Sequence, residues 1–238
     1  MQLSERLRAA AGMVTKGNVV ADIGCDHAYT SVYLCQAGIA PRVIAMDVNK
    51  GPLLGAKAHV EEAGLSEQID IRLSDGLQKL LPGEADTVLL CGMGGLLMIK
   101  ILSDYPETTA SVKELILQPQ SEPAQVRRFL HNRGYEITGE HMLKEDGKFY
   151  VLMRAVKSVS PQRYETECEY QYGKLLLEEK NRVLLAYLER EHRLRRDVLA
   201  ALSGQNTENA RMRRESLQQE FLLIEEARNR ITERKVDV

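Results

Sequence analysis

The sequence has few cysteines and histidines, and their spacing excludes the usual disulfide and metal frameworks. None of the four cysteines forms a C-x-x-C pair, and the five histidines are scattered without a metal-ligand spacing. We therefore expect reduced thiols and no metal site.

Long apolar runs and a large excess of one charge are also missing. The segment Met1–Arg6 lacks the apolar core of a signal peptide, and no apolar run approaches membrane-spanning length. The formal net charge is -2, so the chain as a whole is no polycation and any nucleic-acid surface must be a local patch. These absences predict a cytoplasmic protein with no membrane partner.

Up to Gly134, short apolar runs alternate with helical patterns, after a short helix that we expect from Ser4 to about Met13. The predicted strands are Val19–Ile23, Val43–Asp47, Ile69–Leu73, Thr87–Cys91 and Leu115–Leu117. The predicted helices are Thr30–Ala37, Pro52–Ala63, Leu77–Leu81, Leu96–Leu102 and Pro123–Arg133. This alternation is typical of an α/β fold with a parallel sheet.

The pattern changes after Gly134. Two extended runs, Tyr135–Met142 and Phe149–Val156, are joined by a segment in which Asp146-Gly147 favours a hairpin turn. Five strand–helix units closed by an antiparallel hairpin are the order of the Rossmann-like Class I methyltransferase fold. We assign residues 1–160 to this domain.

Beyond about Tyr164 the composition shifts to Glu, Arg, Leu and Gln without proline. Apolar residues recur every three or four positions, at Leu176, Leu184, Tyr187, Leu188, Leu194, Val198 and Leu202, and again at Leu217, Phe221, Ile224 and Ile231. The segment Ser203–Thr207 interrupts the pattern. We therefore predict two antiparallel α-helices in a coiled-coil hairpin, and assign residues 161–238 to this second domain.

The residues after the first predicted strand indicate which ligand the fold binds. Asp22 and Gly24 end this strand, but Asp26 and Tyr29 stand where G-x-G-x-x-G has its second and third glycines. The chain therefore lacks the glycines that let a pyrophosphate approach the backbone closely, and S-adenosylmethionine fits better. Gly24 lets the backbone pass under its amino-acid end, and Asp22 can accept from its ammonium group. The alternative is an ordinary strand-to-helix turn.

Two further acids end the second and third predicted strands. Asp47 is placed to accept from two ribose hydroxyls, and Asp75, followed by Gly76, to bond the exocyclic amine of adenine. The alternative for Asp75 is a helix N-cap. Three acids at the carboxyl ends of consecutive strands face one crevice, and together they favour S-adenosylmethionine.

The segment Gly92–Gly95 follows the fourth strand, over which a methyl acceptor must lie. Enzymes that methylate the exocyclic amine of adenine have an Asn- or Asp-Pro-Pro-aromatic element at this point, and this chain has none. Methylation of a ring nitrogen or of another acceptor is therefore favoured.

Four more side chains are candidates for the acceptor side. Gln118 and Gln120 can hold the Watson–Crick edge of a base, or they are solvated loop residues. His27 is a general base, a donor to the cofactor carboxylate or a plain loop histidine, and Tyr29 stacks on an extruded base or packs in a helix. Transfer to an unprotonated ring nitrogen needs positioning rather than a strong base.

Arginines flank the interruption in the helical hairpin at similar distances. They are Arg193, Arg195 and Arg196 before it, and Arg211, Arg213 and Arg214 after it. Antiparallel pairing brings both groups to one end. They form either a solvated face neutralised by neighbouring acids or a contact for the phosphate backbone of a structured RNA.

Five motifs resemble those of the bacterial TrmK family, whose members are tRNA (adenine-N1)-methyltransferases acting on adenine 22. They are D-I-G-C-D-H-A-Y at Asp22–Tyr29, G-P at Gly51-Pro52, G-M-G-G at Gly92–Gly95, L-I-L-Q-P at Leu115–Pro119 and E-D-G-K-F-Y at Glu145–Tyr150. The resemblance implies S-adenosylmethionine as methyl donor and tRNA as substrate. By position it places Asp22, Gly24, Asp26, Asp47, Asp75, Gly76, Gly92 and Met93 in the cofactor crevice, and His27, Tyr29 and Gln118 on the acceptor side.

The chain departs from the family pattern at Cys25, where many relatives have serine, at Asp47, where many have glutamate, and at Thr30-Ser31, where Leu-Pro is common. The first two changes are chemically mild, whereas the third changes the first turn of a helix. We expect a monomeric or weakly dimeric methyltransferase acting on N1 of adenine 22 in tRNA. The alternatives are a methyltransferase of small molecules or proteins, and a non-catalytic protein that binds the cofactor and a partner.

Overall fold

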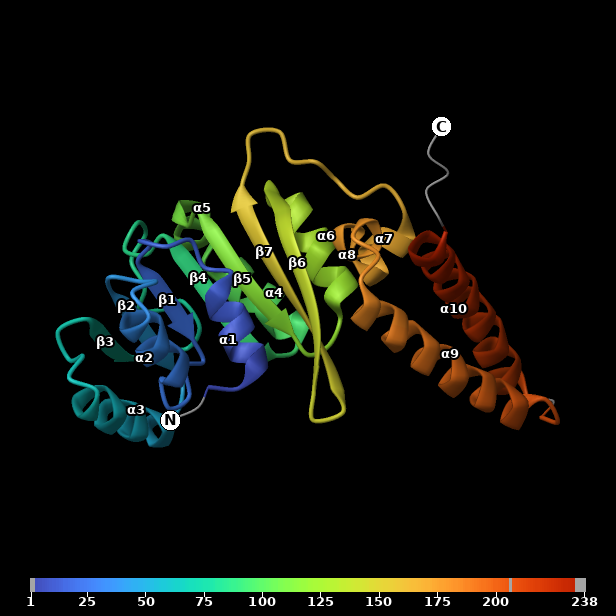
Figure 1. Ribbon diagram of the computed structural model, residues 1–238, viewed down its shortest axis with the longest axis horizontal. Coiled ribbons are helices and arrows are strands. Elements are labelled where there is room, and N and C mark those ends of the chain that lie inside the picture. The colour runs from blue at the N-terminus through green and yellow to red at the C-terminus, as the bar shows by residue number, and fades with distance from the viewer. Residues whose placement is uncertain (1–2, 206, 234–238) are drawn as a thin grey trace. The chain divides into compact units, whose positions relative to one another are not determined.

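The computed structural model describes residues 3–205 and 207–233. The chain divides into two compact units, Met1–Arg163 and Tyr164–Val238 (Figure 1). The first unit contains all the strands, and the second is helical.

A seven-stranded sheet forms the centre of the first unit, in the order β3-β2-β1-β4-β5-β7-β6. Its strands are β1 (Val20–Ile23), β2 (Val43–Asp47), β3 (Ile69–Leu73), β4 (Thr87–Met93), β5 (Glu114–Pro119), β6 (Tyr135–Glu145) and β7 (Lys148–Lys157). The first five strands pair in parallel, and β7 is antiparallel to both β5 and β6. The predicted Rossmann-like α/β fold with a terminal antiparallel hairpin is confirmed.

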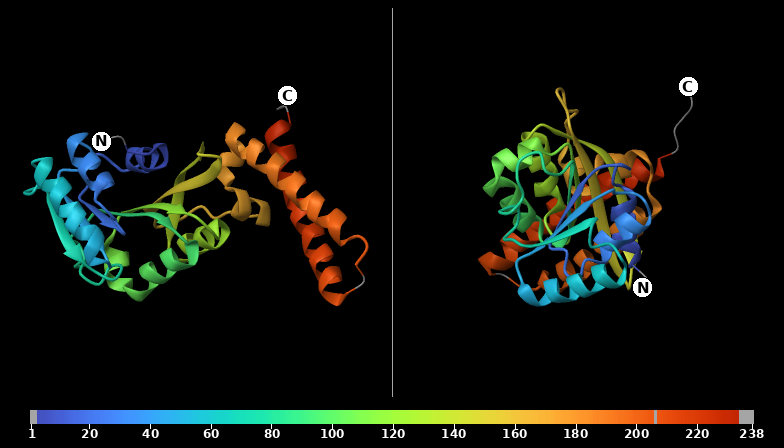
Figure 2. Two further views of the ribbon diagram at one scale, coloured as in Figure 1. Left: turned by 90° about the horizontal axis from the view of Figure 1, so that it is seen from below. Right: turned by 90° about the vertical axis from the view of Figure 1, so that its left-hand side faces the viewer.

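Helices cover both faces of this sheet (Figure 2). On one face lie α1 (Glu5–Gly12), α2 (Tyr29–Gln36) and α3 (Lys50–Glu62), and on the other α4 (Gly95–Asp104), α5 (Pro106–Ser111) and α6 (Pro123–Asn132). Every residue of β1, β2 and β5 is buried, as expected for parallel strands covered on both sides. The core therefore holds the strand ends in fixed relative positions.

Two local predictions differ from the structure. The expected helix Leu77–Leu81 is a turn, because Ser74 Oγ accepts from the Lys79 N–H at 3.1 Å and donates to the Gly76 carbonyl at 2.9 Å. The helix α5 was not expected, although Pro106 at its first position is a usual start signal.

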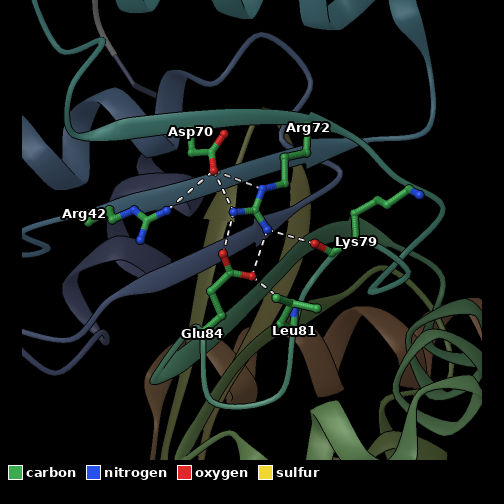
Figure 3. Close-up of polar contacts among 6 residues, drawn as sticks. All are labelled: Arg42, Asp70, Arg72, Lys79, Leu81 and Glu84. Carbon is green, nitrogen blue, oxygen red and sulfur yellow. Dashed lines mark hydrogen bonds and ion pairs between the residues drawn. The ribbon is translucent and has the colours of Figure 1, made fainter.

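Two residues of the edge strand β3 belong to a charge network with side chains from the segments that lead into β2 and β4 (Figure 3). Arg72 donates to Asp70 at 2.6 Å and to Glu84 at 2.5 Å, and Arg42 pairs with Asp70 at 3.5 Å. The hydrogen bonds from Arg72 lower the pKa of Glu84 to about 2. The network thus links β3 to the start of β2 through Arg42 and to the segment before β4 through Glu84.

The second unit consists of α7 (Glu167–Tyr172), α8 (Lys174–Glu178), α9 (Arg182–Leu202) and α10 (Glu208–Thr232). The apolar pattern from Leu176 onward predicted one continuous helix, but the chain breaks it before α9. Lys180 has a φ of +53°, and the Asn181 side chain accepts from the N–H groups of Val183 and Leu184 and so caps α9.

The helices α9 and α10 lie side by side and form the predicted hairpin (Figure 1). Leu188 of α9 and Leu217 of α10 are fully buried, whereas Leu194 and Val198 are 48% and 43% exposed. The apolar stripe of α9 is therefore buried only in its first half. Regular coiled-coil packing stays a prediction.

Candidate cofactor and acceptor site

Asp22 lies at the carboxyl end of β1. Only 4% of this residue is exposed, and Ser31 Oγ of α2 donates to its Oδ2 at 2.6 Å. Burial raises the pKa of Asp22 to about 6, while the Ser31 hydrogen bond opposes this rise and Asp47 adds to it. Ser31 stands where the family resemblance predicts proline, so this hydrogen bond is a consequence of that departure.

Gly24 forms the turn directly after β1. Its φ of +71° is disfavoured for residues with a side chain, and an added Cβ would overlap Cε of Met93 from β4. These two predicted cofactor residues therefore lie against each other. The neighbouring Cys25 is buried, and burial raises the pKa of its thiol, so it stays protonated.

Asp47 joins the end of β2 to this turn. Its carboxylate accepts from the backbone N–H of Asp26 at 3.2 Å and of Asn49 at 2.8 Å. The Asp26 side chain itself is 69% exposed. Asp47 is thus a fixed carboxylate with unused lone pairs, because each of its oxygens receives a single hydrogen bond.

Asp75 lies just beyond the end of β3, and its side chain is exposed. The alternative role as a helix N-cap is wrong, because the segment is a turn and Ser74 supplies the hydrogen bond that holds it. Gly76 is buried with a φ of +54°, and an added Cβ would press on Ile101 of α4.

The side chains of His27 and Tyr29 gather against α3. The ring centroid of Tyr29 lies 4.6 Å from that of His59 and 5.7 Å from that of His27. Nδ1 of His59 is 3.0 Å from the His27 carbonyl oxygen, so this nitrogen carries a proton. A Cβ at Gly55 would overlap the His27 ring, which explains why a glycine stands in that helix.

Gln118 is fully buried in β5 and is not a solvated loop residue. Its Oε1 accepts from the Gly92 N–H at 3.0 Å and from Arg6 Nη1 at 3.3 Å. Its Nε2 is buried and has no hydrogen-bond partner in the described part of the chain. Gln118 therefore holds the end of β4 from inside, whereas Gln120 is exposed.

Three residues near these side chains were missed by sequence reasoning: Arg6, Gly55 and His59. Gly55 and His59 are four residues apart and so share a face of α3. That spacing is visible in the sequence, but nothing in the sequence says that the face meets the loop after β1.

The six hairpin arginines divide into two groups. Arg195 pairs with Glu220 at 2.5 Å and with Glu191, and Arg213 pairs with the same Glu220 at 2.7 Å. Arg214 donates to the carbonyls of Leu202, the last residue of α9, and of Gln205 in the segment that follows. Arg195 and Arg214 therefore link the two helices, whereas the contacts of Arg213 stay within α10.

The other three arginines are exposed. Arg196 lies 3.9 Å from Asp197 and Arg211 lies 3.6 Å from Glu215, distances longer than direct hydrogen bonds. Arg193 is also on the surface. The alternative of a face neutralised by neighbouring acids therefore applies best to Arg195 and Arg213. The basic surface open to a ligand is smaller than the sequence predicted.

Among residues 3–205 and 207–233, no group of three or more His, Cys, Asp or Glu side chains is suited to hold a metal ion. Within the same ranges, every helix is too short or too polar to cross a membrane. All four cysteines are free thiols.

Comparison with known proteins is consistent across sequence and structure. Residues 20–226 match the family model TrmK, tRNA (adenine(22)-N(1))-methyltransferase. The chain is 36% identical over 188 residues to tRNA (adenine(22)-N(1))-methyltransferase of Bacillus subtilis, covering 78% of this chain and 79% of that protein.

Two solved structures are similar over nearly the whole chain. The B. subtilis m1A22 tRNA methyltransferase TrmK has a TM-score of 0.85 at 32% identity, covering 95% of this chain and 99% of that one. M. capricolum TrmK, in complex with the cofactor product S-adenosyl-homocysteine, has a TM-score of 0.86 at 28% identity, covering 97% and 100%.

Proposed function

Because the chain belongs to the TrmK family, tRNA (adenine(22)-N(1))-methyltransferase, we propose specific roles for its residues in that reaction. The protein is an enzyme that transfers a methyl group from S-adenosylmethionine to N1 of adenine 22 in tRNA. One observation carries the assignment of the site. Asp22, Asp47 and Gly92 lie at the ends of three adjacent parallel strands, on the edge where open α/β sheets bind ligands.

The residues at this edge fit S-adenosylmethionine. Asp47 has lone pairs left for ribose hydroxyls, and Asp75 is exposed and open to the adenine amine. Gly24 keeps the turn free of a side chain, and the Asp22 charge favours a cationic ligand. We assign the cofactor to the set Asp22, Gly24, Asp26, Asp47, Asp75, Gly76, Gly92 and Met93.

Bound S-adenosylmethionine supplies an electrophilic methyl group on its sulfonium. Because N1 of neutral adenine carries a lone pair and no proton, no side chain has to remove a proton before transfer. The task of this chain is to hold the extruded base and to exclude water. The rings of His27 and Tyr29 offer it a stacking surface.

Gln118 acts as a positioning residue in this scheme. Its buried amide oxygen binds the Gly92 N–H and so fixes the backbone at the end of β4, beside the acceptor. Loss of this amide should therefore lower the turnover rate and, because Gly92 also belongs to the proposed cofactor set, weaken cofactor binding.

We assign tRNA docking to the helical part, residues 161–238, with the methyltransferase domain in residues 1–160. Within the helical part, Arg193, Arg196 and Arg211 are exposed and free to contact phosphates. Arg195 and Arg214 contribute indirectly, because they link the two helices of the hairpin, and Arg213 contributes by pairing with Glu220, the partner of Arg195.

The natural setting of a tRNA substrate and four free thiols is the cytoplasm, and we assign the protein to it. We expect a monomer or a weak dimer. Sedimentation velocity at several protein concentrations tests this, and a tight dimer would contradict it.

A methylation assay tests the function. Purified protein is incubated with labelled S-adenosylmethionine and a tRNA transcript that carries adenine at position 22, with a guanine-22 transcript as control. We expect label in 1-methyladenosine at position 22 alone. Label in protein or in small molecules would favour another methyltransferase activity, and cofactor binding without transfer would favour a non-catalytic protein.

The docking surface is tested by reversing the three exposed arginines together, Arg193→Glu, Arg196→Glu and Arg211→Glu. The matched control is Arg182→Glu, which changes an exposed arginine at the other end of α9. We expect KM for tRNA to rise at least about tenfold in the triple variant alone. Equal KM values in both would rule out this surface.

A further inference from the structure

Arg6, in the first turn of α1, is fixed at the same edge of the sheet as the proposed acceptor site. Its Nη1 donates to Gln118 Oε1 at 3.3 Å, and its Nε lies 3.8 Å from Glu145 Oε2. Its guanidinium carbon lies 5.6 Å from the centre of the Tyr150 ring. Two segments far from Arg6 in the sequence, β5 and the tip of the β6–β7 hairpin, therefore hold this side chain.

The backbone of α1 is tied to the same place. Glu145, at the end of β6, accepts from the Glu5 N–H at 2.6 Å, and the Ser4 side chain caps the helix. The tip of the β6–β7 hairpin thus fixes both the start of α1 and the Arg6 side chain. Such fixation reduces the rotamer entropy that an arginine would otherwise lose on binding a ligand.

These contacts leave part of the Arg6 guanidinium available to bind a ligand. The Arg6 side chain is 25% exposed, and Nη2 makes no hydrogen bond within residues 3–205 and 207–233. A Cβ on Gly92 would lie 3.8 Å from Arg6 Nη1 and 3.8 Å from Gln120 Nε2, so two donor groups border the Gly92 backbone. A border of two donor groups, one of them a guanidinium, suits an anion.

We propose that Arg6 binds a backbone phosphate of the target nucleotide or of its direct neighbour, and so anchors the strand from which the base is extruded. This inference rests on the proposed function. Extruding a base rotates its sugar and phosphates away from the stack, and that position must be held while the base is in the pocket. Arg6 is a fixed, planar donor fork, which matches phosphate geometry.

The test compares Arg6→Ala, Arg6→Lys and the control Arg8→Ala by tRNA binding over a range of salt concentrations. Arg8 is exposed on the same helix and carries the same charge. Each phosphate contact contributes about 0.7 to 0.9 to the slope of log affinity against log salt. We expect Arg6→Ala to lower this slope by about that amount, Arg6→Lys to retain it, and Arg8→Ala to leave it unchanged.

Kinetics complete the test. For Arg6→Ala we expect kcat/KM for tRNA to fall about tenfold to a hundredfold, with an unchanged Kd for S-adenosylmethionine. An unchanged salt slope in Arg6→Ala, or an equal loss in Arg8→Ala, would overturn the proposal. If the unaltered enzyme formed no 1-methyladenosine, the proposed function would fail instead, whatever the slopes.

Discussion

The buried carboxylate of Asp22 should cost stability at neutral pH while it supports cofactor binding. The perturbation that separates these effects is Asp22→Asn, because asparagine has nearly the same shape and still accepts from Ser31 but cannot ionise. We expect the variant to be more stable than the unaltered protein at neutral pH and to bind S-adenosylmethionine more weakly.

The magnitude follows from the raised pKa. Burial moves the pKa of Asp22 from 3.8 to about 6, and one pH unit corresponds to about 1.4 kcal/mol. The folded state holds this proton more tightly than the unfolded chain, so the contribution of Asp22 to the free energy of unfolding falls as pH rises from about 4 to about 6. Between about pH 4.5 and about pH 7.5 the loss is about 2 kcal/mol.

Urea unfolding at a series of pH values measures this difference. The chain has no tryptophan, so circular dichroism is the appropriate signal. The stabilities of Asp22→Asn and of the unaltered protein should diverge by about 2 kcal/mol over that pH range, in favour of the variant at high pH. The Ser31 hydrogen bond lowers the pKa of Asp22, so its loss in Ser31→Ala should raise that pKa further. In the Ser31→Ala background the divergence should therefore move to higher pH.

Calorimetric titration with S-adenosylmethionine supplies the second readout. Affinity in the unaltered protein should fall as pH drops through about 6, and in Asp22→Asn it should be weak and independent of pH in this range. Parallel stability curves for the two proteins would refute the raised pKa. Equal cofactor affinities at neutral pH would refute an electrostatic role for Asp22.

Three further substitutions test other parts of the structure. Gly24→Ala should destabilise the fold by about 1 kcal/mol and weaken cofactor binding in calorimetry, because the added Cβ displaces Met93. The control is Gly38→Ala, where φ is also positive but the space is open, and it should leave cofactor binding unchanged. Arg127→Met removes the cation from the buried Arg127–Glu140 pair, 2.7 Å apart, and should lower the free energy of unfolding by about 3 to 5 kcal/mol in urea; a loss below 1 kcal/mol would contradict this. Thr166→Ala removes the capping box of α7 and should cost about 1 kcal/mol, seen as faster amide exchange in α7, with Thr166→Ser as the control.

The sequence-based predictions that differ from the structure do so for a common physical reason. Leu77 and Leu80 bury one side of the segment after β3, and a turn held by Ser74 achieves this as well as a helix does. Leu194 and Val198 continue the apolar spacing of α9, but the partner helix does not cover them. Periodicity shows which side chains share a face, and only packing shows whether that face is covered.

The sequence by itself determined the strand–helix order, the glycine turns and the acids at the strand ends, because these depend on local backbone preference and on burial of short apolar runs. Only the tertiary structure decided which of these residues meet. Arg6 reaches Gln118 and Glu145 because β5 lies beside the terminal hairpin and α1 packs across both. It also decided that Gln118 is interior and that two of the six hairpin arginines, Arg195 and Arg214, link the helices. Such contacts depend on strand order and helix pairing rather than on neighbouring residues.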